Sequence, residues 1–319
     1  MQVCMELMEE ALTALARGAA LNPLRTMMRL AGGNGLLGMM PGSLESRRVF
    51  GLKVVGVLPS NHGTDHDSHQ GFVLLFDAEH GLPRAILDAS EITAIRTAAT
   101  SGLATRLLAR ENAGDLAILG TGVQAASHLE AMLCARRLRR VRVFSPTRSR
   151  LEEFAARASR KHGLRVEPAE SAHAAVDGAD LLCTVTTSVE PILLGDWLAP
   201  GTHVNAVGAC TRSARELDSL AVQRSRLFVD RRESVLNEAG DFLIPKSEGV
   251  FGDEHIRGEL GDVLLGRSAG RRSADEITLF KSLGIAVEDL VVASHLDRVA
   301  REQGVGTYVE LGGRRHAAD

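Results

Sequence analysis

The sequence lacks a charge excess, paired cysteines and long apolar runs, and each absence excludes a class of protein. A formal net charge of −3 over 319 residues is too balanced for a dedicated nucleic-acid or membrane-surface binder, which carries a basic excess. No apolar run approaches the roughly 18 residues that a membrane span requires. We therefore expect no nucleic-acid partner and no membrane partner.

The cysteines are scattered along the chain as Cys4, Cys134, Cys183 and Cys210, without a CxxC pair. This usage is typical of free thiols in a reducing compartment. The N-terminal stretch carries acidic residues where a signal peptide carries basic ones. We expect a soluble cytoplasmic protein.

The length and a hydrophobic content of 45% allow two domains, and the pattern of the chain changes once. An amphipathic helix ends near Gly18, and short apolar runs between glycines then predict a largely antiparallel sheet, followed by a long helix over 91–110. From about residue 113 expected strands and helices alternate, which predicts a doubly wound parallel sheet. The pattern therefore predicts the α/β class, with a doubly wound parallel sheet after a mainly antiparallel N-terminal part.

One apolar run breaks into glycines and restarts with helical spacing, in the stretch LAILGTGVQAASHLEAM at 116–132. Gly120, Gly122 and Ala125 form G-x-G-x-x-A between an expected strand and an expected helix. The first glycine permits a tight turn, the second lets the backbone approach a pyrophosphate, and the small third residue lets helix and strand pack closely. A plain tight turn also uses glycines, but the strand–loop–helix–strand context favours a dinucleotide site.

The end of the next expected strand indicates which dinucleotide binds. An NAD site usually has Asp or Glu there, which accepts from the ribose 2′-OH. This strand ends VFSPTRSR, with Ser145, Thr147, Arg148 and Arg150 and no acid. A guanidinium with hydroxyl donors suits a 2′-phosphate, although an ordinary helix cap with Arg150 in solvent gives the same pattern. We predict NADPH as the cofactor, with NADH as the alternative.

Eight stretches, in the order in which they occur, resemble the ornithine cyclodeaminase/mu-crystallin family over nearly the whole chain. They are GLKVVGVLP, SHQGFVLLFDAEHG, ITAIRTAATSGLATRLLAR, AILGTGVQAASHLEAM, EPILLGDWLAPGTHVNAVGA, RELD, ESVLNEAGD and FKSLGIAVEDL. The resemblance implies an α+β substrate-binding and dimerisation domain from residues 1–112 plus 288–319, a Rossmann dinucleotide-binding domain over 113–287, and a homodimer. It also implies nicotinamide-dependent reactions on imines or amino acids.

The resemblance suggests further cofactor-binding residues beyond the glycines and the second strand end. These are Thr97, Val123, Gln124, Thr186, Val207, Ala209 and Ser282. The nicotinamide is expected against the strand end that carries VGAC.

Hydride transfer to an α-imino acid requires cations that hold the substrate carboxylate and a group that protonates the nitrogen. Arg25 lies in PLRTMM, Lys53 in GLKVVGV and Arg96 in AIRTAAT. The resemblance implies that all three bind the substrate carboxylate and that Lys53 is the candidate acid. Burial among Leu52 and 54–57 would lower the pKa of Lys53 and suit proton donation near neutrality. A solvated or ion-paired structural role is the alternative for each, most of all for Arg25.

Cys210 decides between reduction and deamination. The stretch AVGACTRSARELD resembles that of the cyclodeaminases, which carry an aspartate where this chain has Cys210. A thiol with a reference pKa near 8.5 cannot replace a permanently anionic carboxylate that acts as acid or base. Ketimine reductases and alanine-dehydrogenase-like members of the family also lack this acid. We interpret Cys210 as a small buried residue beside the nicotinamide rather than a nucleophile, because no histidine lies nearby in the sequence.

Histidines and aspartates gather in one loop between two expected strands. They are His62, Asp65, His66, Asp67 and His69, in NHGTDHDSHQG. Such spacing can bind zinc opportunistically, but the resemblance covers SHQG without a metal, and we expect none. His69 and Gln70 are expected to hydrogen-bond at the mouth of the cofactor or substrate site. For Asp241, in EAGDF, a supporting or capping role stays open.

These observations predict an NADPH-dependent reductase of α-imino acids, acting on a small-molecule cyclic ketimine such as 1-pyrroline-2-carboxylate or 1-piperideine-2-carboxylate. The products would be proline or pipecolate. The alternatives are an alanine-type amino-acid dehydrogenase, an ornithine cyclodeaminase, and a non-catalytic NADP-binding protein like the crystallin members. Fold alone does not decide among them.

Overall fold

The computed structural model describes residues 1–61 and 64–310, which form two compact units. The parallel-sheet unit comprises Met1–Thr13 and Ala94–Gly284. The antiparallel-sheet unit comprises Ala14–Thr93 and the described residues from Ile285 onward. Within the described part of the chain, no helix has the length and apolar character to cross a bilayer.

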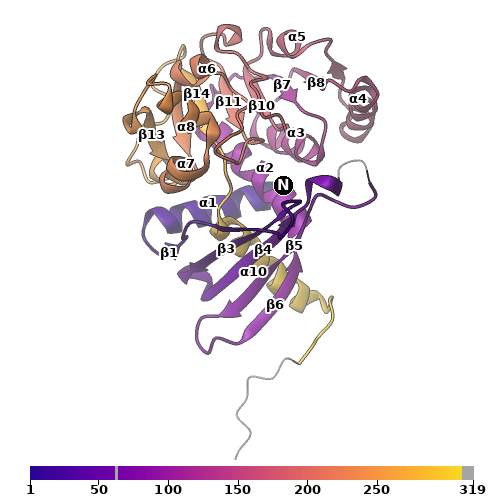
Figure 1. Cartoon of the computed structure of the whole chain (residues 1–319), viewed down its shortest axis with the longest axis vertical. Helices are drawn as coiled ribbons and strands as arrows, with labels where there is room; N and C mark the ends of the chain where they lie inside the picture. Colours follow the sequence, from indigo (N-terminus) through magenta and orange to yellow (C-terminus); the bar gives the residue numbers. More distant parts are fainter. Residues whose placement is uncertain (62–63, 311–319) are drawn as a thin grey trace, which may run out of the picture. The chain divides into compact units, whose positions relative to one another are not determined.

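Eight described strands form the sheet of the parallel-sheet unit (Figure 1). They are β7 Asp115–Leu119, β8 Arg140–Phe144, β9 Val166–Pro168, β10 Leu181–Thr184, β11 His203–Ala206, β12 Ser225–Val229, β13 Ile256–Glu259 and β14 Ile277–Lys281. The spatial order is β13-β12-β14-β11-β10-β7-β8-β9, and the neighbours pair in parallel. The predicted doubly wound parallel sheet is confirmed, because the chain runs outward from β7 to β9 and then returns to the other side of β7 with β10.

Helices cover both faces of this sheet (Figure 1). They are α2 Ala89–Leu108, α3 Val123–Ala135, α4 Arg148–His162, α5 Ala172–Val176, α6 Ser219–Gln223, α7 Arg232–Glu238, α8 Gly240–Ser247 and α9 Leu260–Leu264. Another helix, α1 Gln2–Ala16, packs against α2, with Met5 next to Gly102. Side chains of a strand alternate between faces, and Leu116 and Ile118 accordingly enter one core while Ala117 and Leu119 enter another. The sheet is therefore buried on both sides, as parallel sheets are.

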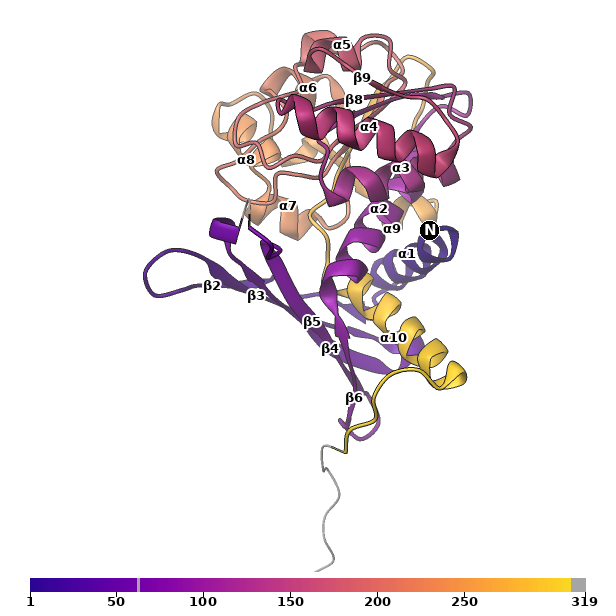
Figure 2. The same cartoon turned by 90° about the vertical axis from the view of Figure 1, so that its right-hand side faces the viewer.

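The antiparallel-sheet unit contains six described strands and one long helix. They are β1 Ala20–Leu21, β2 Thr26–Arg29, β3 Leu36–Leu44, β4 Val49–Val57, β5 His69–Asp77, β6 Pro83–Asp88 and α10 Ala286–Gln303. The main path is β1-β3-β4-β5-β6, and its neighbours pair antiparallel, as the sequence predicted. Figure 2 shows α10 lying against one face of this sheet, where it contacts β3, β4 and β5.

The compact units differ from the domain boundaries expected from the sequence, which assign residues 1–112 plus 288–319 to one domain and 113–287 to the other. The structure groups the first 13 residues and the helix after Thr93 with the parallel sheet. The physical reason is packing, since Ala98 of α2 and Ala109, directly after this helix, share a core with Leu116 of β7. The functional division into domains stays a prediction.

Candidate functional site

The parallel sheet reverses its order between β7 and β10, and the loops after these two strands lie against each other. Gly120, directly after β7, has φ +123°, and an ideal Cβ there would lie 2.8 Å from Val185 O in the loop after β10. A side chain at residue 120 is therefore excluded by both conformation and space. Crevices at such reversals, outside the carboxyl ends of the strands, are where open α/β sheets bind ligands.

For the second glycine of the motif, neither the backbone conformation nor the neighbouring residues require the absence of a side chain. Gly122 is the N-cap of α3 with φ −83° and ψ −167°, which any residue adopts, and a Cβ there would meet nothing within 4 Å. No side chain among the described residues caps the N-terminus of α3, and its first turn holds no acidic residue. The positive end of the helix dipole therefore faces open space, which fits a pyrophosphate.

The other predicted residues of the glycine loop also fit a bound dinucleotide. Ala125 is fully buried, so a larger residue would separate α3 from the sheet. Val123 is exposed at the helix start. The Oε1 atom of Gln124 is buried and has no hydrogen-bond partner among the described residues. A buried amide oxygen without a partner is costly, so a ligand donor would stabilise it.

The end of β8 presents polar side chains to solvent. Ser145 is half-buried, and Thr147 is the exposed N-cap residue of α4. Arg148 is exposed and donates to Glu152 Oε1 at 2.6 Å, one helical turn along α4. This surface ion pair is the alternative to phosphate binding as the role of Arg148. Such exposed pairs contribute little to the stability of the fold.

Loops after β10, β11 and β14 carry the remaining predicted cofactor residues of this sheet. Thr186 and Val207 follow β10 and β11, and Ala209 accepts a hydrogen bond through its carbonyl from Lys281 Nζ at 2.7 Å. Ser282 directly follows β14, and its Oγ atom is buried without a hydrogen-bond partner among the described residues. The structure thus places all four at the carboxyl edge of the sheet, after three consecutive strands of which β10 is the neighbour of β7.

Two predicted residues lie on α2 and are buried there, Arg96 and Thr97. An ideal Cβ on Gly284 would lie 2.3 Å from Arg96 Nη1, so the guanidinium lies directly against the backbone of Gly284. Asp230 Oδ2 accepts from the backbone N–H of Leu283 at 2.6 Å and of Gly284 at 2.7 Å. Asp230 therefore fixes the backbone on which the Arg96 side chain rests.

In the antiparallel-sheet unit, Lys53 of β4 is 3% exposed, so its predicted burial is confirmed. Its Nζ donates to Thr93 Oγ1 at 2.6 Å and lies 3.2 Å from Asp289 Oδ1 of α10. The Thr93 hydroxyl donates to Ala89 O at 2.5 Å, so it accepts from the ammonium. The carboxylate stabilises the charged form of Lys53, and the predicted fall in its pKa stays a prediction.

The other predicted cation of this unit, Arg25, is half-buried and directly precedes β2, whose residues are all exposed. Its predicted apolar setting is therefore only partly present, because the Thr26–Arg29 strand lies at the surface of the unit. Substrate binding by Arg25, Lys53 and Arg96 stays a prediction.

Cys210 differs from its prediction. All the cysteines are free thiols, but Cys210 is exposed rather than buried. It follows β11 in a loop, where its thiol points toward Val207 O at 3.4 Å. Its position at the carboxyl edge of the sheet is as expected, and its exposure follows from that loop.

The histidine loop lies partly outside the described residues, since His62 is not described. Asp65, His66, Asp67 and Gln70 line a hollow of about 580 Å³ on the antiparallel-sheet unit. In residues 1–61 and 64–310, no group of three or more His, Cys, Asp or Glu side chains is arranged to hold a metal. His69 Nδ1 lies 3.0 Å from Ser68 Oγ.

Sequence reasoning missed several residues that hold these groups in place. They are Thr93, Glu216, Asp230, Lys281, Gly284 and Asp289. Asp241, for which the sequence left a supporting or a capping role open, has a supporting role. Its Oδ1 accepts from the N–H of Glu216 at 2.8 Å and of Leu217 at 3.0 Å.

A doubly wound sheet with a glycine loop at its order reversal defines a Rossmann-type dinucleotide-binding protein. The chain belongs to the ornithine cyclodeaminase/mu-crystallin family, which it matches over residues 1–303. The resemblance found in the sequence is thereby confirmed.

Two curated relatives and one solved structure resemble nearly the whole chain. A Delta(1)-pyrroline-2-carboxylate reductase of Bacillus cereus is 37% identical over 302 residues, covering 94% of this chain and 93% of that protein. The ketimine reductase mu-crystallin of Mus musculus is 40% identical over 276 residues, covering 86% and 84%. The Thermococcus litoralis Delta(1)-pyrroline-2-carboxylate reductase in complex with NADH and L-proline superposes with a TM-score of 0.93 at 40% identity, covering 96% and 95%.

Proposed function

We propose that this chain is an NAD(P)H-dependent reductase of cyclic α-imino acids, converting 1-pyrroline-2-carboxylate or 1-piperideine-2-carboxylate to proline or pipecolate. The observation that carries the proposal is the buried ammonium of Lys53, which Asp289 and Thr93 hold in place. A buried cation at a family substrate position suits a substrate that is both a carboxylate and a proton acceptor. The similarity to two cyclic-imine reductases over most of their length supports the same chemistry.

The chain's own residues take the following roles in this proposal. Gly120, Gly122 and the N-terminus of α3 hold the pyrophosphate, and Thr186, Val207, Ala209 and Ser282 hold the nicotinamide half. When bound, the nicotinamide supplies a hydride to the imine carbon. Lys53 Nζ gives its proton to the imine nitrogen, so that C=N becomes CH–NH, while Arg25 and Arg96 bind the carboxylate.

The first test follows NADPH and NADH oxidation with 1-piperideine-2-carboxylate in the absence of ammonia. Oxidation with this ketimine alone is expected. Turnover only with pyruvate plus ammonia would indicate an amino-acid dehydrogenase. Ammonia release from ornithine without net reduction would indicate a cyclodeaminase and would contradict the interpretation of Cys210.

We further propose that NADPH is preferred over NADH, because the end of β8 presents Ser145, Thr147 and Arg148 and no carboxylate. Replacing Arg148 with alanine is expected to raise KM for NADPH about tenfold or more and to leave KM for NADH unchanged. Steady-state kinetics with both coenzymes measure the difference. Arg157→Ala, on the same helix and also in a surface ion pair with Glu153, is the matched control. A wild-type preference for NADH would contradict the proposal.

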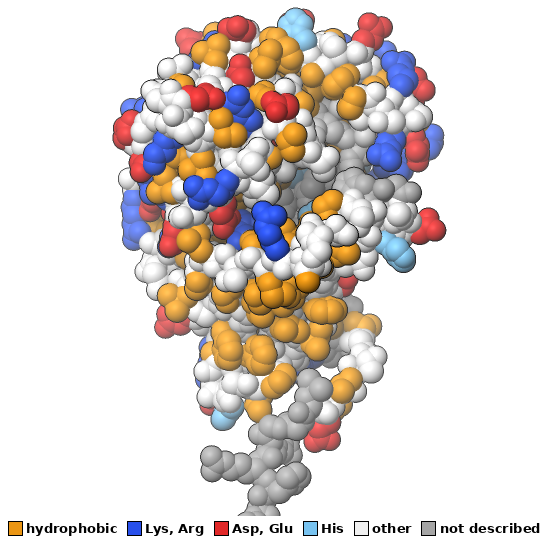
Figure 3. All heavy atoms as spheres, viewed as in Figure 1, with side chains coloured by type: hydrophobic (Ala, Val, Ile, Leu, Met, Phe, Trp, Pro, Cys, Tyr) orange, Lys and Arg blue, Asp and Glu red, His pale blue; other side chains and the backbone are white. Residues whose placement is uncertain are grey.

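A homodimer is the third part of the proposal. Phe50, Phe72 and Ile86 are exposed on the antiparallel sheet, and Phe50 stacks on Phe76 with ring centroids 5.2 Å apart. Alternation along the strands places these residues on the face opposite Lys53, since Lys53 pairs with Val73 while Phe72 pairs with Val54. Figure 3 shows hydrophobic side chains gathered over this sheet. Apolar faces of this kind mark protein–protein contacts.

The dimer is tested by light scattering after size exclusion. The wild type is expected at twice the chain mass of 34.1 kDa. Ile86→Glu places a charge in the apolar face and is expected to give the monomer. Glu79→Gln, an exposed change on the turn between β5 and β6, serves as the control and should stay dimeric. A wild-type monomer would overturn this part of the proposal.

A further inference from the structure

A cluster of buried charges lies behind the loops at the carboxyl edge of the parallel sheet. Glu216, Asp241 and Lys281 are each no more than 2% exposed. Glu216 lies in the segment between β11 and α6, Asp241 near the start of α8, and Lys281 is the last residue of β14. Three charged side chains in a core cost free energy unless their hydrogen bonds are satisfied.

Glu216 joins the ends of two neighbouring strands. Its Oε1 accepts from the backbone N–H and from the hydroxyl of Thr186, both at 2.7 Å. Its Oε2 accepts from the Gly208 N–H at 2.7 Å and from the Thr184 hydroxyl at 2.8 Å. An ideal Cβ on Gly208 would lie 2.1 Å from Thr186 O, so glycine is required for this close approach.

Asp241 and Lys281 link Glu216, and through it the ends of β10 and β11, to the end of β14. Asp241 Oδ2 lies 2.9 Å from Lys281 Nζ, while its Oδ1 accepts from the backbone N–H of Glu216. Lys281 Nζ also donates to Ala209 O. Burial opposes the charged form of Lys281, but Asp241, Cys210 and Glu216 outweigh it and raise its pKa, so the ammonium persists.

We propose that Glu216 is a positioning residue for the nicotinamide, acting through Thr186 and Gly208 and supported by the Asp241–Lys281 pair. Its carboxylate fixes the spacing of the loops after β10 and β11, to which the proposed function assigns nicotinamide contacts. Hydride transfer depends steeply on the distance and alignment of the reacting atoms. The inference rests on the proposed function. It adds to that function the residue that holds the loops after β10 and β11 at a fixed distance from each other.

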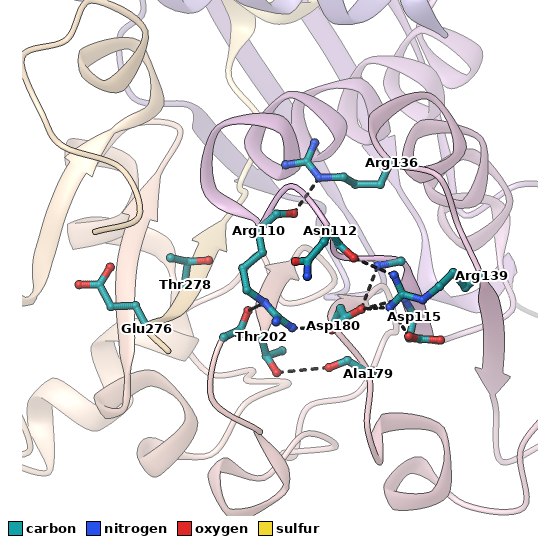
Figure 4. A network of polar contacts seen from close by, with 12 residues as sticks. Arg110, Asn112, Asp115, Arg136, Arg139, Ala179, Asp180, Thr202, Glu276 and Thr278 are labelled. Carbon is teal, nitrogen blue, oxygen red and sulfur yellow. Dashed lines mark hydrogen bonds and ion pairs between the residues drawn. The ribbon is translucent and has the colours of Figure 1, made fainter. Parts of the chain in front are cut away.

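Asp180, a half-buried carboxylate directly before β10, provides a matched control at the opposite edge of the sheet. Asp180 accepts from the backbone N–H of Gly114 at 2.9 Å and of Asp115 at 3.1 Å. Figure 4 shows Arg110 and Arg139 reaching the same carboxylate, at 2.5 Å and 2.6 Å. Asp180 precedes β10, at the amino ends of the strands, whereas Glu216 binds residues at and beyond their carboxyl ends.

The experiment compares Glu216→Gln with Asp180→Asn. An amide presents one N–H₂ where Glu216 accepts, so at least one backbone N–H loses its partner. We expect Glu216→Gln to raise the Kd for NADPH and NADH about tenfold, and to lower kcat by at least as much. We expect Asp180→Asn to lower Tm similarly and to leave both Kd and kcat within about twofold of wild type.

Coenzyme fluorescence in the absence of an imine measures Kd, so the inference can fail or hold whatever substrate the enzyme takes. If Glu216→Gln does not fold, Thr184→Val removes one of the four donors without adding a charge, and a rise in Kd of about threefold is expected. The inference would be overturned if Kd and kcat were unchanged in Glu216→Gln or, where that variant does not fold, in Thr184→Val. It would also be overturned if Asp180→Asn raised Kd and lowered kcat by as much as Glu216→Gln. Failure of the wild type on cyclic imines would contradict the proposed function alone.

Discussion

Lys53→Met is expected to lower kcat/KM for 1-piperideine-2-carboxylate by about 10³, within the range of roughly 10²–10⁴ that a positioned general acid contributes. Methionine keeps much of the length and removes both the proton and the charge. Coenzyme binding should stay unchanged, because Lys53 belongs to the antiparallel-sheet unit. Steady-state kinetics and coenzyme fluorescence together separate these effects.

The single variant also removes the cation beside Asp289, and losing one member of a buried pair costs about 3–5 kcal/mol. The double variant Lys53→Met/Asp289→Asn is therefore the control. We expect it to recover Tm without recovering turnover. Retention of more than about a tenth of the wild-type kcat/KM in the double variant would exclude Lys53 as the acid.

The second large effect concerns acid stability. Burial lowers the pKa of His128 to about 4 from its ordinary 6.5, despite the hydrogen bond to Gln124 O at 2.8 Å. Nδ1 donates to that carbonyl, and the Ser101 hydroxyl therefore donates to Nε2 at 2.9 Å. A proton on Nε2 would require the Ser101 hydroxyl to turn and accept, and it would leave the imidazolium charge buried without an opposite charge in the hydrogen bonds it makes. Burial, assisted by Arg271, likewise lowers the pKa of His203 to about 3.

Because the folded pKa is depressed, the unfolded chain binds the proton first as the pH falls. The stability is complete above pH 6.5 and is lost at about 1.4 kcal/mol per pH unit for each histidine down to its folded pKa. His128 alone is expected to remove on the order of 3 kcal/mol between pH 6.5 and 4. Urea unfolding at a series of pH values measures this slope.

His128→Gln should make the slope shallower over that range, whatever it does to stability at pH 7. His80→Gln changes an exposed histidine in the turn after β5 and should leave the slope as it is. An identical slope in wild type and His128→Gln would show that acid unfolding has another cause.

Much of the fold could be predicted because its signals are local. The glycine loop, the alternation of strands and helices after residue 113 and the long helix α2 all appear in short windows of sequence. Strands β12, β13 and β14 were not predicted, since apolar runs of four or five residues cannot be assigned by periodicity alone. The short helices between them, one of which contains Pro245, obscure the alternation further.

Only part of the candidate site could be predicted from the sequence. The glycine loop follows β7, and Lys53 and Arg96 are buried, as expected, but Arg25 is half-buried and Cys210 is exposed, and binding by these residues stays a prediction. Their supports were not found, because a glutamate between Arg215 and Leu217 has the pattern of a solvated charge. Glu216 is buried because Thr184 at the end of β10, and Thr186 and Gly208 in the loops after β10 and β11, bind its carboxylate. One sequence contains no signal for such convergence.

The partner of Lys53 is encoded 236 positions later, on α10. A nascent chain that has passed β4 and β5 must therefore leave the ribosome without the carboxylate that neutralises this lysine and without the helix that covers its side of the sheet. Closure over so long a separation is intrinsically slow. The surroundings of the proposed acid are thus assembled last, and an incomplete translation product carries the Rossmann sheet but no finished proton donor.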